Sequence, residues 1–430
     1  MSTITHDLLV HGMAAAKAGD KSQAESYLKR LLSLNPSEHE QVEACHWLAD
    51  LTNDPLEKRT YLEEILSRNL GDVRARRKLA ILNGELAPDE IIQPDELQIS
   101  PRPASVRTDP VRFDCPNCGS RMVFSPDGNS LVCENCGTRC DASPQPQSNP
   151  IEGEASFTVA MATIRGHSKP VQEKVIACQG CGAEFHWDPA ILSGNCPYCE
   201  APYAENQAVE KQIIQPDRLI PFLLEATEVR ERINDWLSVK NFDEITGLSN
   251  PRGFYFPAWI FDLGGQLFWT GQMRCNKKWE SVHGTKVLYY NDIIAPASTH
   301  FKGELQDILQ SYDLTVLTSF DPRYLAGWTA ETYQIPVGDA SISVRKIVLD
   351  KEKRLIAGQY EHPVRDLKID GSSMTIDTYQ LALLPVWLVN CQIDQTPCQI
   401  AINGYNGKIV GDIPEKGFSR WMNAVFDRPD

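Results

Sequence analysis

The chain has 430 residues with 57 acidic and 42 basic side chains, and its formal net charge of −15 argues against a general polyanion binder, because phosphate contacts need clustered lysine and arginine. The N-terminus lacks the basic segment and the apolar core of a signal peptide. The most apolar run contains a proline and is shorter than the roughly 20 residues that cross a bilayer, so we expect a cytoplasmic protein without a membrane span.

Residues 1–84 predict an all-α helical repeat. The stretch GMAAAKAGDKSQAESYLKRLLSLNP has small residues and a final proline where a tetratricopeptide repeat needs them. Part of it recurs 34 residues later, where Tyr61 and Leu62 correspond to Tyr27 and Leu28, and 34 residues is the tetratricopeptide length. A last helix around DVRARRKLAILNG would cap the open end. The alternative is a plain helical bundle with accidental self-similarity.

Two proline-rich segments predict linkers, at residues 85–110 and 141–156. Between them lies a first cysteine-rich unit at residues 111–140. After the second linker, FTVAMATI predicts a strand that leads into a second cysteine-rich unit at residues 157–205. The chain is therefore expected to be multidomain, with two small units in its middle.

Residues 206–430 predict a C-terminal α+β domain with mainly antiparallel strands. Seven of the nine tryptophans lie there, and FYFPAWIFDL and LALLPVWLVN are apolar and aromatic, as buried strands are. These two stretches place Trp259 and Trp387 in the core, and CQIAINGYNGKIVGDI predicts a hairpin. Two helical faces are also expected. Their residues are Val229, Ile233, Trp236 and Leu237 for one, and Leu305, Ile308, Leu309 and Tyr312 for the other.

The two cysteine-rich units share one frame, in which fourteen residues separate two CxxC pairs, and the second unit begins 63 residues after the first. A CxxC turn brings two thiolates to one side, and two facing turns supply four sulfurs at tetrahedral corners, about 2.3 Å from a zinc ion. We expect the fourteen residues to form the hairpin that carries the second turn. The sequence thus predicts two zinc ribbons and two Zn²⁺ per chain. The predicted ligands are Cys115, Cys118, Cys133 and Cys136, and Cys178, Cys181, Cys196 and Cys199.

Three other kinds of chemistry are alternatives to structural zinc at these thiols. Disulfides within a CxxC pair are disfavoured in the expected compartment. Rubredoxin-type iron would use the same four thiolates and is a chemical rival to zinc. Catalytic zinc needs an open coordination position, which four thiolates do not leave. Cys140 is expected to be a bystander to the first set. The other cysteines, expected to be core residues, are Cys45, Cys275, Cys391 and Cys398.

The sequence contains no motif that predicts catalysis, because it lacks a phosphate-binding loop, HExxH, GxSxG and GxGxxG. His167 and His186 lie near the cysteine units and are expected to be solvated or to cap local structure. Residues 111–142 carry three basic and four acidic side chains, and residues 171–205 carry one basic and five acidic. Four thiolates and a Zn²⁺ add about two further negative charges to each unit. Neither unit therefore offers a cationic face to nucleic acid.

Several stretches carry a family resemblance. The second unit, RGHSKPVQEKVIACQGCGAEFHWDPAILSGNCPYCEAPY, is followed by YFPAWIFD, DPRYLAGWTAETYQI and LALLPVWLVNCQI. Over residues 155–415 this series resembles bacterial double zinc-ribbon proteins that are often labelled relatives of the primosomal replication-restart helicase. The N-terminal repeat is similar to segments that precede such proteins.

The resemblance implies the fold and bound zinc, and little chemistry. A helicase needs a nucleotide-binding loop and a metal-binding acid, and this sequence has neither. Many relatives continue into membrane-spanning segments after the GKIVGDIP hairpin. Here EKGFSRWMNAVFDRPD follows, which weakens the expectation of a membrane role.

These observations predict a non-enzymatic, zinc-binding adaptor that binds a protein partner through its helical repeat and its C-terminal domain, with the ribbons as rigid spacers. One alternative is a nucleic-acid-binding zinc-ribbon protein linked to replication or transcription. A weaker alternative is an electron-transfer protein with iron in the ribbons. The one dense basic cluster lies in the final helix of the repeat and is expected to be a solvated face. It consists of Arg74, Arg76, Arg77 and Lys78.

Overall fold

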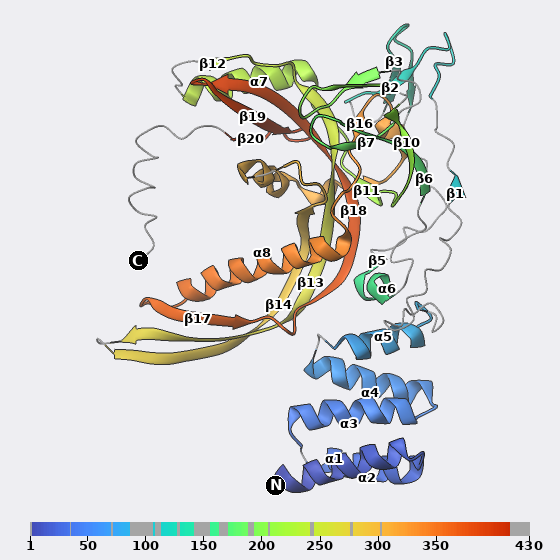
Figure 1. Ribbon diagram of the computed structural model, residues 1–430, viewed down its shortest axis with the longest axis vertical. Coiled ribbons are helices and arrows are strands. Elements are labelled where there is room, and N and C mark those ends of the chain that lie inside the picture. The colour runs from blue at the N-terminus through green and yellow to red at the C-terminus, as the bar shows by residue number, and fades with distance from the viewer. Residues whose placement is uncertain are drawn as a thin grey trace.

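The computed structural model shows a stack of N-terminal helices joined to a sheet-rich domain (Figure 1). Most of residues 85–110 and 141–156, His167 and the segment after residue 412 lie outside the described residues. The residues that the structure describes are 2–34, 36–69, 72–86, 106–107, 113–126, 130–141, 155–162, 171–187, 193–204, 207–240, 245–275, 278–301 and 303–412.

Five helices form the N-terminal region, and each packs on the next along the chain. Capping side chains begin four of them, and at Ser37 a full capping box with Glu40 is present. The predicted 34-residue internal repeat falls on α2 and α4, where Leu28 and Leu62 are both fully buried. The repeated leucine is therefore buried in both helices. The helices are α1 (Ser2–Lys17), α2 (Lys21–Ser33), α3 (Glu38–Leu51), α4 (Pro55–Arg68) and α5 (Val73–Leu82).

The C-terminal domain is built on one large, mainly antiparallel sheet, as the sequence predicts. Its central strands, β13 (Arg252–Cys275) and β18 (Thr375–Ile393), pair with Trp259 opposite Leu381. The strand β14 (Lys278–Pro296) flanks β13, and the predicted hairpin is present as β19 (Thr396–Asn403) and β20 (Ile409–Asp412). Shorter strands of this sheet are β5 (Ala155–Ser156), β11 (Arg218–Leu219), β12 (Ile245–Thr246), β15 (Thr318–Ser319), β16 (Thr329–Ala330) and β17 (Val364–Asp370).

The two faces of this sheet bury different cores, because successive side chains of a strand point to opposite sides. One face packs against α7 (Ala226–Lys240) and α8 (Val337–Gly358), and it holds Trp259 and Trp387. The other face packs against a 3₁₀ helix, η4 (Gly303–Ser311), which carries most of the second predicted apolar face. Both tryptophans are buried, so the core positions predicted for them are confirmed.

The expectation of a strand at FTVAMATI is wrong, because residues Phe157–Ala162 form the helix α6. Threonine and valine favour strands, but packing overrides this preference here. The ring of Phe157 contacts Phe261 and Tyr379 edge-on, with centroid distances of 6.3 and 6.1 Å. The same short helix contacts α5, so it fills the space between the helical stack and the sheet.

One ion pair also joins these two regions. Nη1 of Arg76 on α5 lies 2.5 Å from the carboxylate of Asp377 on β18, and its Nη2 donates to the Thr375 hydroxyl at 2.8 Å. Within the part of the chain that the structure describes, no helix combines the length and apolar character needed to cross a membrane.

Candidate metal centres

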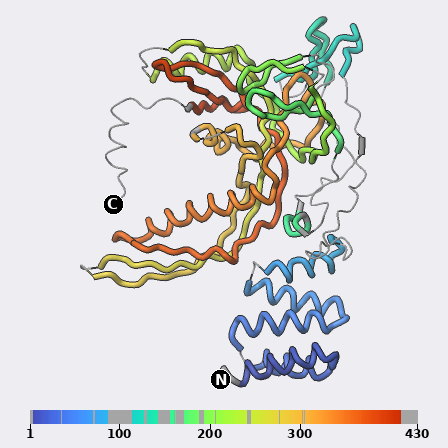
Figure 2. Tube along the Cα trace, viewed as in Figure 1, coloured from blue at the N-terminus to red at the C-terminus, as the bar shows by residue number. Residues whose placement is uncertain are grey.

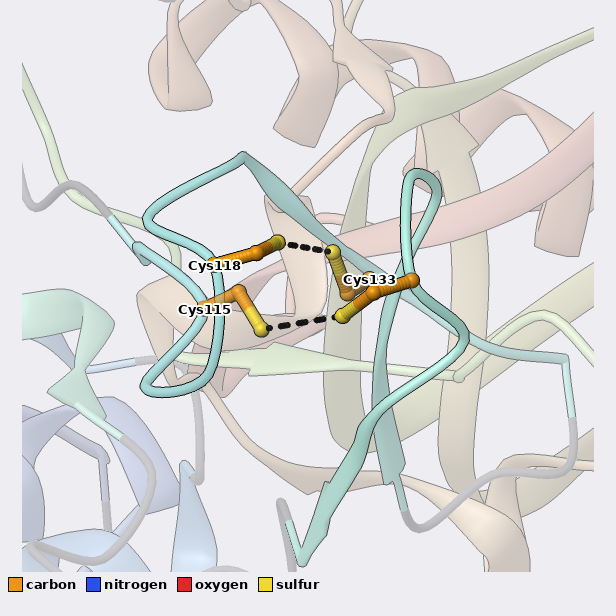
Figure 3. Close-up of side chains that lie close together, drawn as sticks. Cys115, Cys118 and Cys133 are labelled. Atoms are coloured by element: carbon orange, nitrogen blue, oxygen red, sulfur yellow. Dashed lines mark hydrogen bonds between the residues drawn. The ribbon is translucent and has the colours of Figure 1, made fainter.

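The first cysteine set lies at the base of a small three-stranded sheet, formed by β2 (Met122–Phe124), β3 (Ser130–Cys133) and β4 (Arg139–Asp141). The strands β2 and β3 pair between the two CxxC turns, as the hairpin prediction requires. The sulfurs of Cys115 and Cys136 are 3.6 Å apart, and those of Cys118 and Cys133 are 3.5 Å apart. Figure 3 shows the side chains of Cys115, Cys118 and Cys133 converging from the two turns.

The second set has the same sulfur geometry but a different strand arrangement. The sulfurs of Cys178 and Cys199, and those of Cys181 and Cys196, are 3.5 Å apart in each pair. The expected hairpin differs here among the described residues, since β7 pairs with β6 and β8 pairs with β9. These strands are β6 (Val171–Ala177), β7 (Glu184–His186), β8 (Ser193–Asn195) and β9 (Pro202–Ala204). A further strand, β10 (Val209–Ile213), extends this sheet beyond β6.

Both sets fit a tetrahedral metal ion. Within each set all four sulfurs lie within 4.8 Å of one another. A metal–sulfur distance of about 2.3 Å gives sulfur–sulfur edges of about 3.8 Å in a tetrahedron, close to the spacings found here. Gly119 and Gly182, which follow the first turn of each set, have φ of +70° and +80°, which glycine adopts readily. The structure therefore brings together each predicted set of four, and each set could hold one metal ion.

The surroundings favour the thiolate form at one or more sulfurs of each set, and the thiolate is the form that binds metal. The hydroxyl and the backbone N–H of Thr138 lower the pKa of Cys136 to about 5. Burial opposes ionisation of Cys178, but the backbone N–H groups of Cys181 and Gly180 outweigh it and lower its pKa to about 7. Cys140, the expected bystander, does not belong to the first set.

The two cysteine units pack on opposite faces of the same sheet. Tyr255 and its neighbour Phe254 point to opposite sides of β13 and illustrate the division. Tyr255 belongs to the core that contains the first unit's Phe124, and Phe254 belongs to the core that contains the second unit's Phe185. The expectation that the ribbons are spacers is therefore wrong, because each unit is continuous with the core of the C-terminal domain.

One stretch of the chain, residues 320–335, contacts both units, and we call it the bridging segment. It includes η6 (Pro322–Leu325) and β16. On the first unit, the N–H of Phe124 donates to the carbonyl of Ala326 at 2.8 Å, and the indole N–H of Trp328 donates to the carbonyl of Phe124 at 3.1 Å. Gly327 has φ of +84°, and a Cβ there would lie 2.7 Å from Val123. Glycine thus permits the close contact.

On the second unit, the bridging segment supplies a buried carboxylate, Glu331, which is inaccessible to solvent. It accepts hydrogen bonds from the hydroxyls of Tyr198 at 2.5 Å and Ser298 at 2.6 Å. Its Oε1 also lies 2.9 Å from Nδ1 of His300. The other ring nitrogen of His300 lies 3.2 Å from the carbonyl of Cys181, so it must donate a proton to that oxygen.

This network ties the second metal site to the sheet domain. Burial is the main cause that raises the pKa of Tyr198 well above its usual value, and the charge of Glu331 adds to it, so Tyr198 stays a protonated donor. Beside the network, the amide of Gln334 donates to the carbonyl of Gly182 at 3.1 Å. The backbone N–H of Thr332 donates to the carbonyl of Glu184 at 2.8 Å. Residues next to the metal ligands thereby bond to a segment more than a hundred positions away.

We expect Glu331→Ala to destabilise the second unit more than Glu331→Gln does. Alanine leaves the two buried hydroxyls of Tyr198 and Ser298 without this acceptor, and each unsatisfied group costs about 1–3 kcal/mol, whereas glutamine keeps one acceptor oxygen. The measurement is hydrogen exchange of residues 171–187, together with the rate at which a chelator removes the second metal ion. Glu280→Ala, which removes an exposed carboxylate on β14, is the control. Equal exchange in the alanine variant and the wild type would show that the network is not stabilising.

Two further expectations concern groups outside these sets. His186 is not simply solvated, because its Nδ1 lies 2.5 Å from the carboxylate of Glu173. In the basic cluster of α5, Arg74 and Lys78 both pair with Asp50, at 3.2 and 2.5 Å. Together with the Arg76–Asp377 contact, these pairs engage most of the cluster's charge within the protein.

Comparison with known proteins gives one distant relative. The chain is 25% identical to the uncharacterized protein YdjG of Bacillus subtilis (strain 168) over 342 residues, which cover 73% of this chain and 94% of that protein. No protein-family profile matches the chain. No solved structure matches it either. The likeness to primosomal helicase relatives receives no support from these comparisons.

Proposed function

We propose that the chain is a cytoplasmic, non-enzymatic adaptor that binds two zinc ions and holds protein partners through its N-terminal helices and its C-terminal domain. The observation that carries this proposal is the placement of the two four-cysteine sets. Each set is closed, because four thiolates leave no coordination position for a substrate. Each set also lies against the core of the sheet domain, where a metal ion would stabilise the fold.

Zinc is the proposed metal, and iron is its rival at the same four thiolates. Four thiolates in a tetrahedron are typical of structural zinc, and both kinds of metal accept them. The four thiolates support the metal site itself. Elemental analysis of the purified protein would identify the metal.

Two surfaces are available for protein partners. The helices α1–α4 extend away from the sheet domain, so their surfaces are not covered by it (Figure 2). The β13–β14 hairpin also projects (Figure 1), and near the middle of β14 the side chains of Val287 and Tyr289 are about 70% exposed. These two residues lie on the same side of the strand, because they are two positions apart. Exposed tyrosine beside an apolar side chain is typical of protein interfaces.

We expect the full-length protein to capture a protein partner and to leave nucleic acid unbound. In fluorescence-anisotropy titrations, duplex and single-stranded DNA should bind no more tightly than about 10⁻⁴ M at physiological salt, because the basic cluster of α5 is paired with acids. Affinity capture from the host should recover a stoichiometric protein partner, and Tyr289→Lys should weaken that recovery. Val239→Lys is the matched control, since Val239 is equally exposed on α7.

One outcome would count against the adaptor, and a second would change the surface assigned to its partner. Micromolar DNA binding that weakens steeply with salt and disappears on charge reversal of Arg74 and Lys78 would favour the nucleic-acid alternative. Recovery of the same partner by wild type and by Tyr289→Lys would move the partner site away from β14 and leave the N-terminal helices as the proposed surface.

A further inference from the structure

Two cysteines that belong to neither metal set lie directly opposite each other in the sheet. Cys391 on β18 and Cys398 on β19 are register partners in an antiparallel pair. Directly paired residues of such strands have Cα atoms about 4.5–5.5 Å apart, and disulfide-bonded cysteines have Cα atoms about 4.4–6.8 Å apart. Paired residues also point to the same face of the sheet. The register therefore places the two Cα atoms at a spacing that a disulfide can bridge.

The two cysteines are also among the residues that border a pocket. It has a volume of about 430 Å³, and its walls include Gly247, Gln392 and Pro397 beside the two cysteines. Both cysteines are 4% exposed, and neither forms a disulfide in this structure. The pocket brings solvent next to the strand segment that carries the pair.

The turn next to the pair is conformationally restricted. Asp394 and Gln395 join the two strands with φ of +48° and +65°, a conformation that residues other than glycine adopt at some cost. The strands that leave this turn bring Cys391 and Cys398 together without further rearrangement of the backbone. A covalent link there would close a ring of eight residues around the turn.

We propose that Cys391 and Cys398 form a dithiol modification site, which a small peroxide entering the pocket converts reversibly into an intrachain disulfide. One thiolate attacks a peroxide oxygen, the O–O bond breaks, and a sulfenic acid forms while the first water leaves. The second thiol attacks that sulfur, the S–S bond forms, and the departing hydroxide takes the thiol proton as the second water. Two electrons pass from the two sulfurs to the peroxide.

The thiol of Cys391 is protonated at rest, so its oxidation is slow at neutral pH. Burial raises the pKa of Cys391 to about 11, and the neighbouring Cys398 adds to the shift. The thiol of Cys398 donates to the carbonyl of Thr396 at 3.2 Å. The rate of oxidation should therefore increase with pH from 7 to 9, because the thiolate is the attacking species.

Peptide mapping tests the proposal directly. The tryptic peptide of residues 369–408 contains both cysteines and no other. The metal-loaded, full-length protein is treated with hydrogen peroxide, alkylated under denaturing conditions and digested. The peptide should become two hydrogens lighter and resist alkylation, and dithiothreitol should restore two alkylation sites. Cys391→Ser and Cys398→Ser should abolish this product.

Cys45 serves as an internal control. It is buried, and burial raises its pKa to about 11 as well, but it has no cysteine opposite it. It should remain alkylatable under the conditions that oxidise the pair. The proposal is overturned if Cys391 and Cys398 stay reduced up to the peroxide concentration that releases metal from the four-cysteine sets. It is also overturned if they oxidise separately to sulfinic acids, or if Cys45 oxidises at the same rate.

Discussion

Cys178→Ser should reduce the metal content from two zinc ions per chain to one and should unfold much of the C-terminal domain. A structural zinc site contributes on the order of 10 kcal/mol of folding free energy. Whole domains are stable by only about 5–15 kcal/mol. Cys178 itself lies in the core that also contains Phe254 and Phe256 of the central strand, so the damage cannot stay within the cysteine unit.

Elemental analysis and limited proteolysis would measure these two effects. New cleavage is expected within residues 171–204 and within the sheet domain, while α1–α5 keep their resistance because they have cores of their own. Cys275→Ser is the matched control, since Cys275 lies at the end of β13 and belongs to neither set. Two zinc ions in the variant, or iron in the wild type, would contradict the zinc assignment.

Trp259→Ala should lower the local stability of the central strands by roughly 3–5 kcal/mol, the usual cost of emptying a tryptophan site in a core. Trp259 is completely buried, and its indole N–H donates to the carbonyl of Ile335 at 2.8 Å. The substitution leaves a large cavity beneath α8 and removes the donor from a carbonyl of the bridging segment.

Hydrogen exchange is the suitable measurement, because a multidomain chain has no single unfolding free energy. The amides of β13 and β18 should exchange roughly 10² to nearly 10⁴ times faster, since each 1.4 kcal/mol is a factor of ten. Trp279→Ala is the control. Trp279 is 38% exposed near the tip of the hairpin, where it stacks with Arg365, so its loss should cost under about 1 kcal/mol. Equal effects of the two substitutions would argue against a dominant core role for Trp259.

The features that the sequence predicted well are those with local signals. The spacing of Cys115 and Cys118, and of Cys178 and Cys181, is a property of a four-residue turn, so the spacing alone identified the two sets that the structure assembles. Trp259 and Trp387 lie in unbroken apolar runs, which marked them as core. The sequence repeat between α2 and α4 could be recognised because both helices bury the repeated leucine, Leu28 in one and Leu62 in the other. Whether these helices form a tetratricopeptide repeat stays a prediction.

The features that were missed depend on contacts between distant residues. Glu331 pairs with Tyr198 from 133 positions away, and the sequence around it shows a mixed segment in which Asp321 is a second acid. Its position in DPRYLAGWTAETYQI, between apolar and aromatic residues, was the one available signal. The length of β13 was also missed, because Gly264 and Gly265 interrupt the apolar pattern although the strand continues through them. FTVAMATI was misassigned because its helix depends on packing against β18 and α5.

The bridging segment contacts both cysteine units, although they lie on opposite faces of the sheet, so we expect metal binding at one site to affect the other. Phe124 of the first unit bonds to Ala326 and Trp328, and the same short segment presents Glu331 to the second unit. Because the first ion would already order the bridging segment, less conformational entropy should be lost when the second ion binds. Linkage of this kind lowers the affinity for the remaining ion, so a chain that has lost one ion to a chelator should release the other faster than the fully loaded protein does.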